Sequence, residues 1–531
     1  MRPVELETDV LVLGGGSAGL CAAMAAREAG ARVTLAYKRG GNATAVAAGG
    51  YAVVLPDAAD DSMDRLMADA LRSGTELVDQ PLLRRLAERA YPAIERVTEW
   101  GVEFYRNEDG SYRRFRSGGH SVPRSLRCAS GRGSDSYGVL FRRAGEEGVA
   151  MLKNALITQL LRKDGRVRGA AGMDGDGNPL LIAAKTVVLA TGGMAALYEH
   201  TTTAPGLTGE GYILALEAGC RLRDMEFVQF MPTTLAAPPG LKGKLVNDTL
   251  RGEGAAILNS EGERFMERYD PVLKDVAARD ILSAAIAKEV AAGRGSPMGG
   301  VYVDARHIPE RALLQSFGAC KALRAAGIDP SRDLIEVVPA AHFSCGGVVI
   351  DVDCHTDVPG LYAVGEVAGG IHGANRLGAT ALTENVVFGQ IAGQLAAEEA
   401  EKTPAPAGLT WDVPAQCSDC PPDQGTEDML TGGEKKIRHI LWQYGGILRD
   451  ARGLTQGLVE LGYLDRQLSE LPTPNFVQQQ KKRRLTQLVY LASLVLQSAL
   501  RRTESRGCHT RTDFPDTDPS QEKSIILSLK D

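Results

Sequence analysis

The sequence has few histidines and tryptophans and no long apolar run. Among its 531 residues are eight histidines and three tryptophans, and no histidine precedes His120. No stretch reaches the roughly eighteen consecutive apolar residues of a membrane helix. The N-terminus also has no basic segment followed by an apolar run. We therefore expect a cytoplasmic protein without a signal peptide and without direct membrane insertion.

A basic surplus and a cysteine framework are missing as well. Lys and Arg number 60 against 66 Asp and Glu, giving a formal charge of −6, which does not favour binding to nucleic acid. The nine cysteines are odd in number and dispersed, as expected of reduced thiols. Only Cys417 and Cys420 have ligand-like spacing. Without a second pair nearby they predict a linker loop, and no metal site is expected.

A dinucleotide-binding signature is present at the N-terminus. An apolar run leads into Gly14, Gly16 and Gly19 in GxGxxG spacing, and an alanine-rich segment and a second apolar run follow. This order predicts a βαβ unit whose glycines permit the tight turn, the approach of a pyrophosphate and close helix packing. The acidic residue that usually ends the second strand is missing, because Tyr37 and Lys38 stand there. That departure favours FAD over NAD.

Two later strands also end in glycine. One is "KTVVLATGG", which reaches Ala190, Thr191 and Gly192, and the other is "GLYAVGE", which ends at Glu366. Strands that feed one nucleotide crevice should end in this way, so the FAD-binding domain is predicted to be discontinuous. The predicted division is FAD-binding domain 1–228 and 339–400, capping domain 229–338, linker 401–429, and C-terminal helical domain with a terminal tail 430–531.

In this order the motifs resemble one family, the flavoprotein subunits of fumarate reductase and succinate dehydrogenase together with L-aspartate oxidase. The matching segments include "GGGSAGL", "ATGG", "RGEGA", "AARD", "HFSCGGVVID", "GEVAGGIHGANRLGATAL" and "ESRGCHTRTDFP". The resemblance implies an α/β fold, in which a Rossmann-like FAD-binding domain carries an inserted α+β capping domain and is followed by a C-terminal helical domain. Several members attach FAD through a histidine, but Ala43 occupies that position here, so noncovalent FAD is expected.

The resemblance also implies which residues contact the cofactor. They are Gly14, Gly16, Ser17, Ala18, Gly19, Lys38, Thr44, Gly49, Gly50, Ala155, Ala190, Thr191, Gly192, Glu210, Glu366, Arg376, Ala381 and Leu382.

The same resemblance implies catalytic roles. Arg279 of "AARD" matches the family's proton donor, with Arg251 and Asp248 as its relay, where relatives carry Glu in place of the aspartate. Arg376 and His342 match the pair that grips a substrate carboxylate. An arginine fits this task because its planar guanidinium binds a carboxylate through two hydrogen bonds.

The departures from the family lie at the far end of the pocket. Met231 replaces a histidine that meets the second carboxylate, and Asn247 replaces a threonine. Ser117 occupies the position at which L-aspartate oxidases have a glutamate that binds the amino group of the substrate. His120 is either near the flavin and substrate or structural, and His372 is expected to steady its loop or approach the flavin edge.

The leading interpretation is an FAD-dependent oxidoreductase that interconverts a fumarate-like 2-enoate and its saturated acid. L-Aspartate oxidase and a flavin-bearing electron-transfer subunit of a larger complex are the alternatives. Since no haem or cluster motif occurs, electrons are expected from a partner protein, such as an iron–sulfur protein, or from a small reductant.

Overall fold

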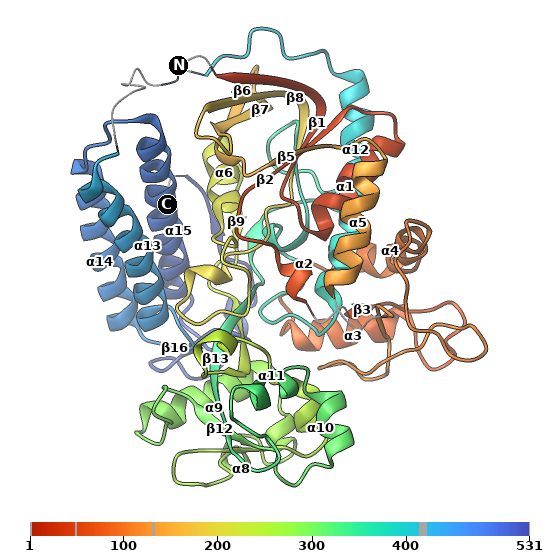
Figure 1. The fold of residues 1–531 in the computed structure, drawn as a ribbon, viewed down its shortest axis with the longest axis vertical. Coiled ribbons are helices and arrows are strands. Elements are labelled where there is room, and N and C mark those ends of the chain that lie inside the picture. The colour runs from red at the N-terminus through yellow and green to blue at the C-terminus, as the bar shows by residue number, and fades with distance from the viewer. Residues whose placement is uncertain (1–2, 48–49, 130–132, 412, 414–421, 530–531) are drawn as a thin grey trace.

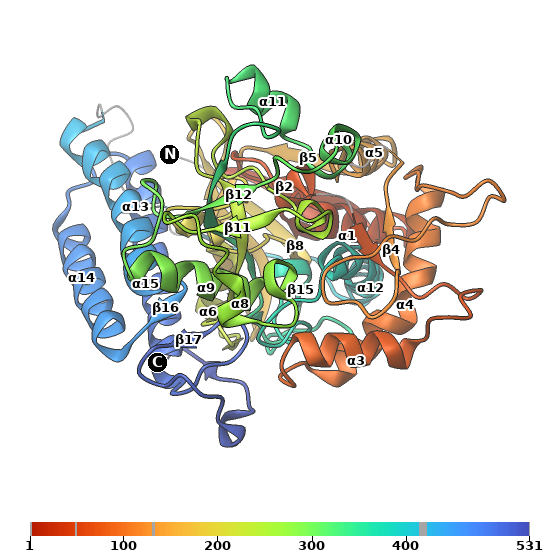
Figure 2. The ribbon, with the colours of Figure 1, turned by 90° about the horizontal axis from the view of Figure 1, so that it is seen from below.

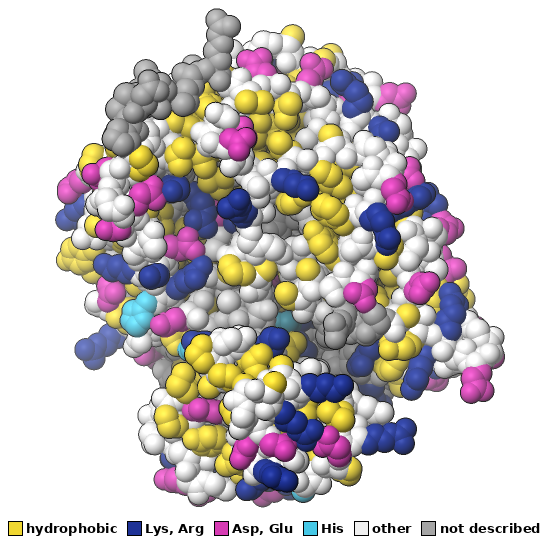
Figure 3. All heavy atoms as spheres, in the orientation of Figure 1, with side chains coloured by type: hydrophobic (Ala, Val, Ile, Leu, Met, Phe, Trp, Pro, Cys, Tyr) yellow, Lys and Arg dark blue, Asp and Glu magenta, His cyan; other side chains and the backbone are white. Residues whose placement is uncertain are grey.

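The structure, a computed structural model, describes residues 3–47, 50–129, 133–411, 413 and 422–529. It shows a large body, a smaller lobe at the bottom and a bundle of long helices at the left (Figure 1). The space-filling outline narrows where the lower lobe joins the body (Figure 3).

A seven-stranded sheet forms the centre of the body. Its strands run in the order β5 (Ala150–Lys153), β2 (Val33–Tyr37), β1 (Val4–Leu13), β8 (Pro179–Leu189), β7 (Arg166–Met173) and β6 (Leu156–Lys163). The short strand β15 (Leu361–Ala363) pairs with the last residues of β8. The strands β5, β2, β1, β8 and β15 pair in parallel, whereas β7 pairs antiparallel with both β8 and β6. The carboxyl ends of the parallel strands therefore meet at one edge, where α/β sheets bind nucleotides.

Two helices from opposite parts of the chain cover this sheet together. They are α1 (Ser17–Glu28) and α12 (Thr380–Lys402), which cross closely because α12 has glycines at the contact. A Cβ at Gly389 would lie 2.6 Å from the Ala18 carbonyl oxygen, and one at Gly393 would lie 2.1 Å from that of Ala22. This crossing fixes the segment before α12, which contains Arg376, against the glycine loop.

The body also contains several further helices and two short strands. They are α2 (Ala43–Val46), β3 (Gly50–Ala52), α3 (Met63–Ser73), α4 (Gln80–Glu99), β4 (Ser125–Arg127), α5 (Gly133–Glu146) and α6 (Glu210–Ala218).

The lower lobe has a sheet and a hydrophobic core of its own. Four antiparallel strands run in the order β10 (Val228–Leu235), β13 (Ile335–Ser344), β12 (Val301–Asp304) and β11 (Ala256–Leu258). Its helices are α7 (Asp248–Gly252), α8 (Met266–Tyr269), α9 (Arg279–Ala291), α10 (Glu310–Ser316) and α11 (Cys320–Ala325). A separate core cluster that includes Leu250, Phe265, Ile286 and Val303 holds them together. The long strands β10 and β13 join this lobe to the body, as in the predicted α+β insertion.

Three long helices form the C-terminal bundle. They are α13 (Gln424–Tyr444), α14 (Ala451–Glu470) and α15 (Phe476–Arg501), and they lie side by side in both views (Figures 1 and 2). Short connections between them and buried leucines such as Leu441, Leu461 and Leu488 explain the packing. The mixed architecture confirms the predicted fold class. None of the helices in the described ranges combines the length and apolar character that crossing a bilayer requires.

The last residues, predicted as a tail, are instead packed against the body. Strand β18 (Ile526–Leu527) pairs with β9 (Leu222–Arg223), which also pairs with β14 (Gly347–Val348). Leu527 is fully buried, and the Ile525 carbonyl oxygen accepts a hydrogen bond from the Asp224 amide. The polar composition of this segment hid a two-residue strand whose partner lies about three hundred residues earlier.

Candidate functional site

In the glycine loop after β1, Gly14 and Gly19 are packed closely against other backbone atoms, whereas Gly16 has free space beside it. A Cβ at Gly14, where φ is +117°, would lie 2.1 Å from the Ala190 carbonyl oxygen, and one at Gly19 would lie 1.9 Å from that of Gly14. At Gly16 the nearest atom would be 3.7 Å away, and this residue has no side chain to cap α1. The open position at a helix N-terminus suits a pyrophosphate.

Segments far apart in the chain meet at this loop. The Ser17 hydroxyl accepts hydrogen bonds from the Thr44 hydroxyl at 3.0 Å and from the Asn385 amide at 2.9 Å. The Thr44 hydroxyl oxygen also accepts the Ser17 backbone N–H at 3.0 Å. The loop, α2 and α12 are thus held in one place by residues that sequence spacing alone could not bring together.

The missing acidic residue at the end of β2 is replaced by Glu210 from the start of α6. Its Oε1 lies 2.6 Å from Lys38 Nζ, so the carboxylate stands beside the end of β2. Burial alone would raise the pKa of Glu210, but the charges of Lys38 and Arg484 outweigh it and lower the pKa to about 2. An ionised carboxylate therefore occupies the place where dinucleotide folds bind a ribose.

The other residues that the resemblance assigns to the cofactor come from several segments of the body. Thr191 has a buried hydroxyl without a hydrogen-bond partner among the described residues, which suits a polar ligand. The rest are Ala18 in α1, Gly50 in β3, Ala155 bonded to the end of β2, Ala190 and Gly192 after β8, and Ala381 and Leu382 in α12. Gly49 lies outside the described residues. The glycine loop after β1, the Thr191 hydroxyl and the carboxylate of Glu210 together fit FAD.

Glu366 lies just after β15 in this crevice and forms no ion pair with the cations among the described residues. Its Oε1 accepts the Ser344 N–H at 2.9 Å, and burial raises the pKa of Glu366 to about 7.

Three predicted catalytic residues form a connected chain in the lower lobe. Arg279, the first residue of α9, donates from Nη2 at 3.0 Å and from Nε at 3.2 Å to Asp248 Oδ2. Arg251 Nη2 donates to the other oxygen of Asp248 at 2.8 Å. Burial would raise the pKa of Asp248, but the two arginine charges hold it below its ordinary range. The predicted relay residues are therefore in direct contact.

Arg376 reaches the same place from the body and forms no ion pair with a carboxylate in the described part of the chain. It is 7% exposed, stacks over Phe343 with 4.6 Å to the ring centroid, and donates to the Leu377 carbonyl oxygen and to Gln229 Oε1. Its Nε has no partner among the described residues. Burial and the nearby charge of Arg279 lower the pKa of Arg376 to about 10. A buried guanidinium without a counter-charge suits an anionic ligand.

Gln229 joins the two arginines and was missed by the sequence analysis. Its Oε1 accepts from Arg376 Nη2 at 3.1 Å and from Arg279 Nη1 at 3.4 Å. Its amide nitrogen donates to Asn375 Oδ1 at 2.6 Å and to the Arg376 carbonyl oxygen at 2.9 Å. The residue was visible in "QFMPT" as an uncharged polar side chain at the start of an apolar strand.

His342 completes the group on β13. Its Nδ1 lies 2.7 Å from the Thr202 hydroxyl, and no hydrogen bond joins its Nε2 to any described residue. Burial and the charges of Arg279 and Arg376 hold the pKa of His342 well below its usual value. The ring is therefore neutral, and Nε2 remains available to a ligand.

Met231 and Asn247, the residues predicted at the far end of the pocket, are neighbours of site residues in the chain: Met231 shares β10 with Gln229, and Asn247 directly precedes Asp248. Met231 is 3% exposed on β10, yet it belongs to none of the hydrophobic clusters formed by the described residues. Asn247 precedes α7, and its side chain does not cap that helix.

The remaining histidines of the region have protein partners. His120 Nε2 lies 2.6 Å from the Gly378 carbonyl oxygen, and its Nδ1 lies 2.9 Å from Arg124 Nη1. His372 Nε2 lies 2.8 Å from Glu384 Oε2. Both ring nitrogens of His120 are thus engaged, which favours its structural role over the substrate-binding one.

No cluster of three or more potential metal ligands occurs within the described part of the chain. Cys417 and Cys420 lie outside it.

Comparisons with known proteins agree with this geometry. A family model described as FAD binding domain matches residues 9–382, and one described as fumarate reductase flavoprotein C-term matches residues 434–526. The chain is 34% identical to a fumarate reductase (CoM/CoB) subunit of Methanothermobacter marburgensis, over 99% of this chain and 97% of the relative. It is 37% identical to an L-aspartate oxidase of Mycobacterium tuberculosis, over 98% and 95%.

Solved structures give the same result. A chain of Escherichia coli quinol fumarate reductase superimposes with a TM-score of 0.86 at 28% identity, covering 99% of this chain and 94% of that one. Sdh1 of Mycobacterium smegmatis does so with 0.86 at 30% identity, covering 98% and 92%. The chain therefore belongs to the family of FAD-dependent oxidoreductases that includes the fumarate reductase and succinate dehydrogenase flavoproteins and L-aspartate oxidase.

Proposed function

We propose that this oxidoreductase interconverts a 2-enoate and the corresponding saturated acid. The observation that carries the proposal is the meeting of two arginines at Gln229. Arg376 forms no ion pair with any residue that the structure describes, whereas Arg279 is bonded to the carboxylate of Asp248. One arginine is thus available to bind an anion, and the other is connected to a group that can move protons.

In this proposal Arg376 and His342 bind the substrate. The guanidinium of Arg376 gains the counter-charge that it lacks when a carboxylate binds, and two parallel hydrogen bonds fix the plane of that carboxylate. The neutral ring of His342 donates from Nε2, since the Thr202 hydroxyl can donate to Nδ1. Bound FAD supplies hydride exchange at one carbon of the substrate double bond.

In this proposal Arg279 transfers the proton at the neighbouring carbon. Loss of a proton from an arginine is costly in water, where its pKa exceeds about 12. Here the proton is replaced along a short path, because Asp248 is bonded to both Arg279 and Arg251. The side chain of Asp248 is 31% exposed, so the path reaches solvent at its middle member.

The second end of the substrate is proposed to be uncharged. Met231 offers a thioether instead of a hydrogen-bond donor, and a carboxylate placed there loses hydration at a cost of roughly a few kcal/mol. An amide, ester or apolar substituent avoids that cost.

L-Aspartate oxidation is the second candidate, favoured by the 36–37% identity to several proteins of that name over 98% of this chain. Ser117 argues against it, because the resemblance places a glutamate there in those enzymes. An electron-transfer subunit that works with an iron–sulfur partner is the third candidate, and it agrees with a relative whose name describes a subunit.

A panel of enoates tests the proposal, with dithionite-reduced viologen as electron donor. We expect enoate-dependent oxidation of the viologen, fastest for monocarboxylic or amide-ended enoates. The control is anaerobic and aerobic incubation with L-aspartate. Aspartate-dependent hydrogen peroxide without enoate reduction would instead identify an oxidase, and activity only with a partner protein would identify an electron-transfer subunit.

A further inference from the structure

Glu210 is held through only one of its two carboxylate oxygens. Lys38 Nζ at 2.6 Å, Arg484 Nε at 2.7 Å and the Thr208 hydroxyl at 2.7 Å all contact Oε1. No hydrogen bond joins Oε2 to any described residue. Since two cations keep this carboxylate ionised, its free oxygen is a strong hydrogen-bond acceptor.

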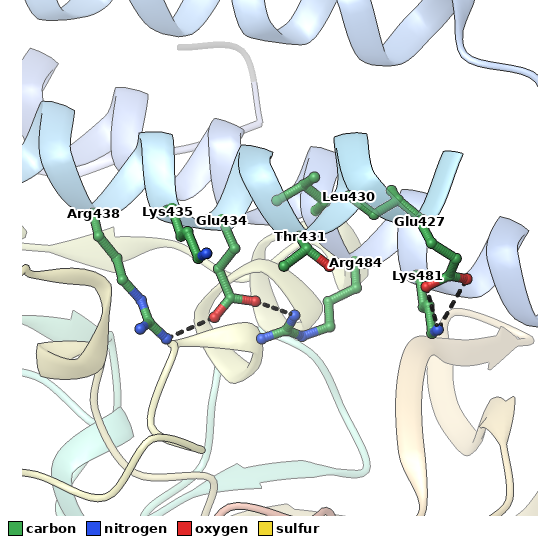
Figure 4. Close-up of a pocket in the computed structure, with 9 residues that line it drawn as sticks. Glu427, Leu430, Thr431, Glu434, Lys435, Arg438, Lys481 and Arg484 are labelled. Atoms are coloured by element: carbon green, nitrogen blue, oxygen red, sulfur yellow. Dashed lines mark hydrogen bonds and ion pairs between the residues drawn. The ribbon is translucent and has the colours of Figure 1, made fainter. Parts of the chain in front are cut away.

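One of those cations comes from the C-terminal bundle. Arg484 lies on α15 and also donates to the Thr208 hydroxyl at 3.1 Å. Its Nη1 lies 2.8 Å from Glu434 Oε2 on α13, and Glu434 Oε1 lies 2.7 Å from Arg438 Nη2. Figure 4 shows Glu434 between the two arginines. The position of Arg484 is thus fixed from the helix on its other side.

The two sides of this network differ in their exposure to solvent. A cavity of about 370 Å³ between α13 and α15 is lined by Arg484, Glu434 and Lys481, among others. On the opposite side of Arg484, the Glu210 carboxylate is 9% exposed. The bundle therefore presents a charged side chain to a buried position at the end of β2.

We propose that Arg484 is a positioning residue for the adenosine half of the FAD site. By holding Oε1 of Glu210, it leaves Oε2 for the ribose hydroxyls at the place where β2 lacks an acidic residue of its own. Binding of the adenosine ribose then depends on a contact between the C-terminal helices and the sheet. This inference is independent of which substrate the enzyme reduces.

Competition between FAD and nucleotide probes for the FAD-free protein tests the proposal through flavin fluorescence. The probes are ADP and 2′,3′-dideoxyadenosine diphosphate, which lacks both ribose hydroxyls. The wild-type protein should prefer ADP by about tenfold, the size of one hydrogen bond to a charged acceptor. Arg484→Met should reduce this preference to about threefold or less, because Oε1 then keeps only Lys38 and Thr208 and the carboxylate is less firmly oriented.

Lys481→Met is the matched control. Lys481 lines the same cavity and pairs with Glu427 at 2.8 Å between the same two helices, but it does not contact Glu210. Its loss should leave the preference for ADP unchanged. A structural defect of the bundle would instead weaken both probes equally in either variant.

Glu210→Gln gives a second route if Arg484→Met fails to fold. It should abolish the preference, and combining it with Arg484→Met should cause no further loss, since both act on one contact. The proposal is overturned if the wild-type protein does not distinguish the probes, if Glu210→Gln retains the preference, or if Lys481→Met loses it to the same degree as Arg484→Met.

Discussion

Met231 is the residue on which substrate choice depends most in the proposed site. Met231→His should raise kcat/KM for fumarate by about tenfold or more, because a hydrogen bond to a charged group contributes roughly 1.5–3 kcal/mol. Met298→His, on the exposed surface of the lower lobe, is the control. Steady-state kinetics with fumarate and with a monocarboxylic enoate measure the change. Efficient fumarate reduction by the wild type, unaffected or harmed by the substitution, contradicts this account of the pocket.

Glu366 gives the FAD-free protein a specific dependence on pH. Burial raises the pKa of Glu366 from 4.5 to about 7, so the folded state binds the proton more tightly than the unfolded state. Its contribution to stability is therefore complete below about pH 4.5 and is lost as pH rises through about 7. Urea unfolding between pH 5 and 7.5 should show a steeper loss of stability in the wild type than in Glu366→Gln. Parallel profiles would mean that Glu366 does not titrate in this range.

The residues of the site were identified from the sequence more readily than their contacts. The resemblance named Arg279, Arg251, Asp248, Arg376 and His342, and the structure brings them to one place. The resemblance did not indicate that Gln229 joins the two arginines, because the three residues are separated by up to 147 positions. The contact between Glu210 and Lys38 was not indicated either, because 172 positions separate the two residues. Neither segment by itself has the pattern of a ribose-binding site.

At the level of elements, long periodic segments were predicted, and of the short strands β15 was predicted but β18 was not. The βαβ unit and the three C-terminal helices have regular apolar patterns over many residues, and these patterns depend little on distant partners. Strand β18 has only two residues, and only its pairing with β9 defines it.

That short strand leads to a stability prediction. Leu527→Ala should lower the free energy of unfolding by about 2–4 kcal/mol, because it removes a fully buried side chain from the contact between β18 and β9. Leu529→Ala, whose side chain is 51% exposed, should change it by less than about 0.5 kcal/mol. Urea denaturation measures both variants. Equal effects would show that the C-terminal segment does not pack as described.

At the scale of the whole molecule, we expect contacts from several segments to hold FAD without a covalent bond. Ala43, where some relatives have the linking histidine, packs beside Ala196, Ala204 and Leu207 and offers no nucleophile. Acid precipitation of the protein should therefore release the flavin into the supernatant. A yellow pellet that resists washing would disprove noncovalent binding.

The body and the lower lobe contribute opposite halves of the proposed chemistry. Arg376 comes from the segment before α12, whereas Arg279, Asp248 and Arg251 come from the lower lobe. The proposed chemistry therefore requires both parts of the chain.

The most direct test of this account is anaerobic stopped-flow reoxidation of the reduced flavin by an enoate that the wild-type protein accepts. In Arg279→Lys the rate of reoxidation should fall by about 10²–10⁴-fold, the usual contribution of a general acid, while flavin content stays unchanged. Arg306→Lys, at an exposed ion pair of the lower lobe, should retain the wild-type rate. A rate in Arg279→Lys within a factor of about three of the wild type would show that the proton comes from another group.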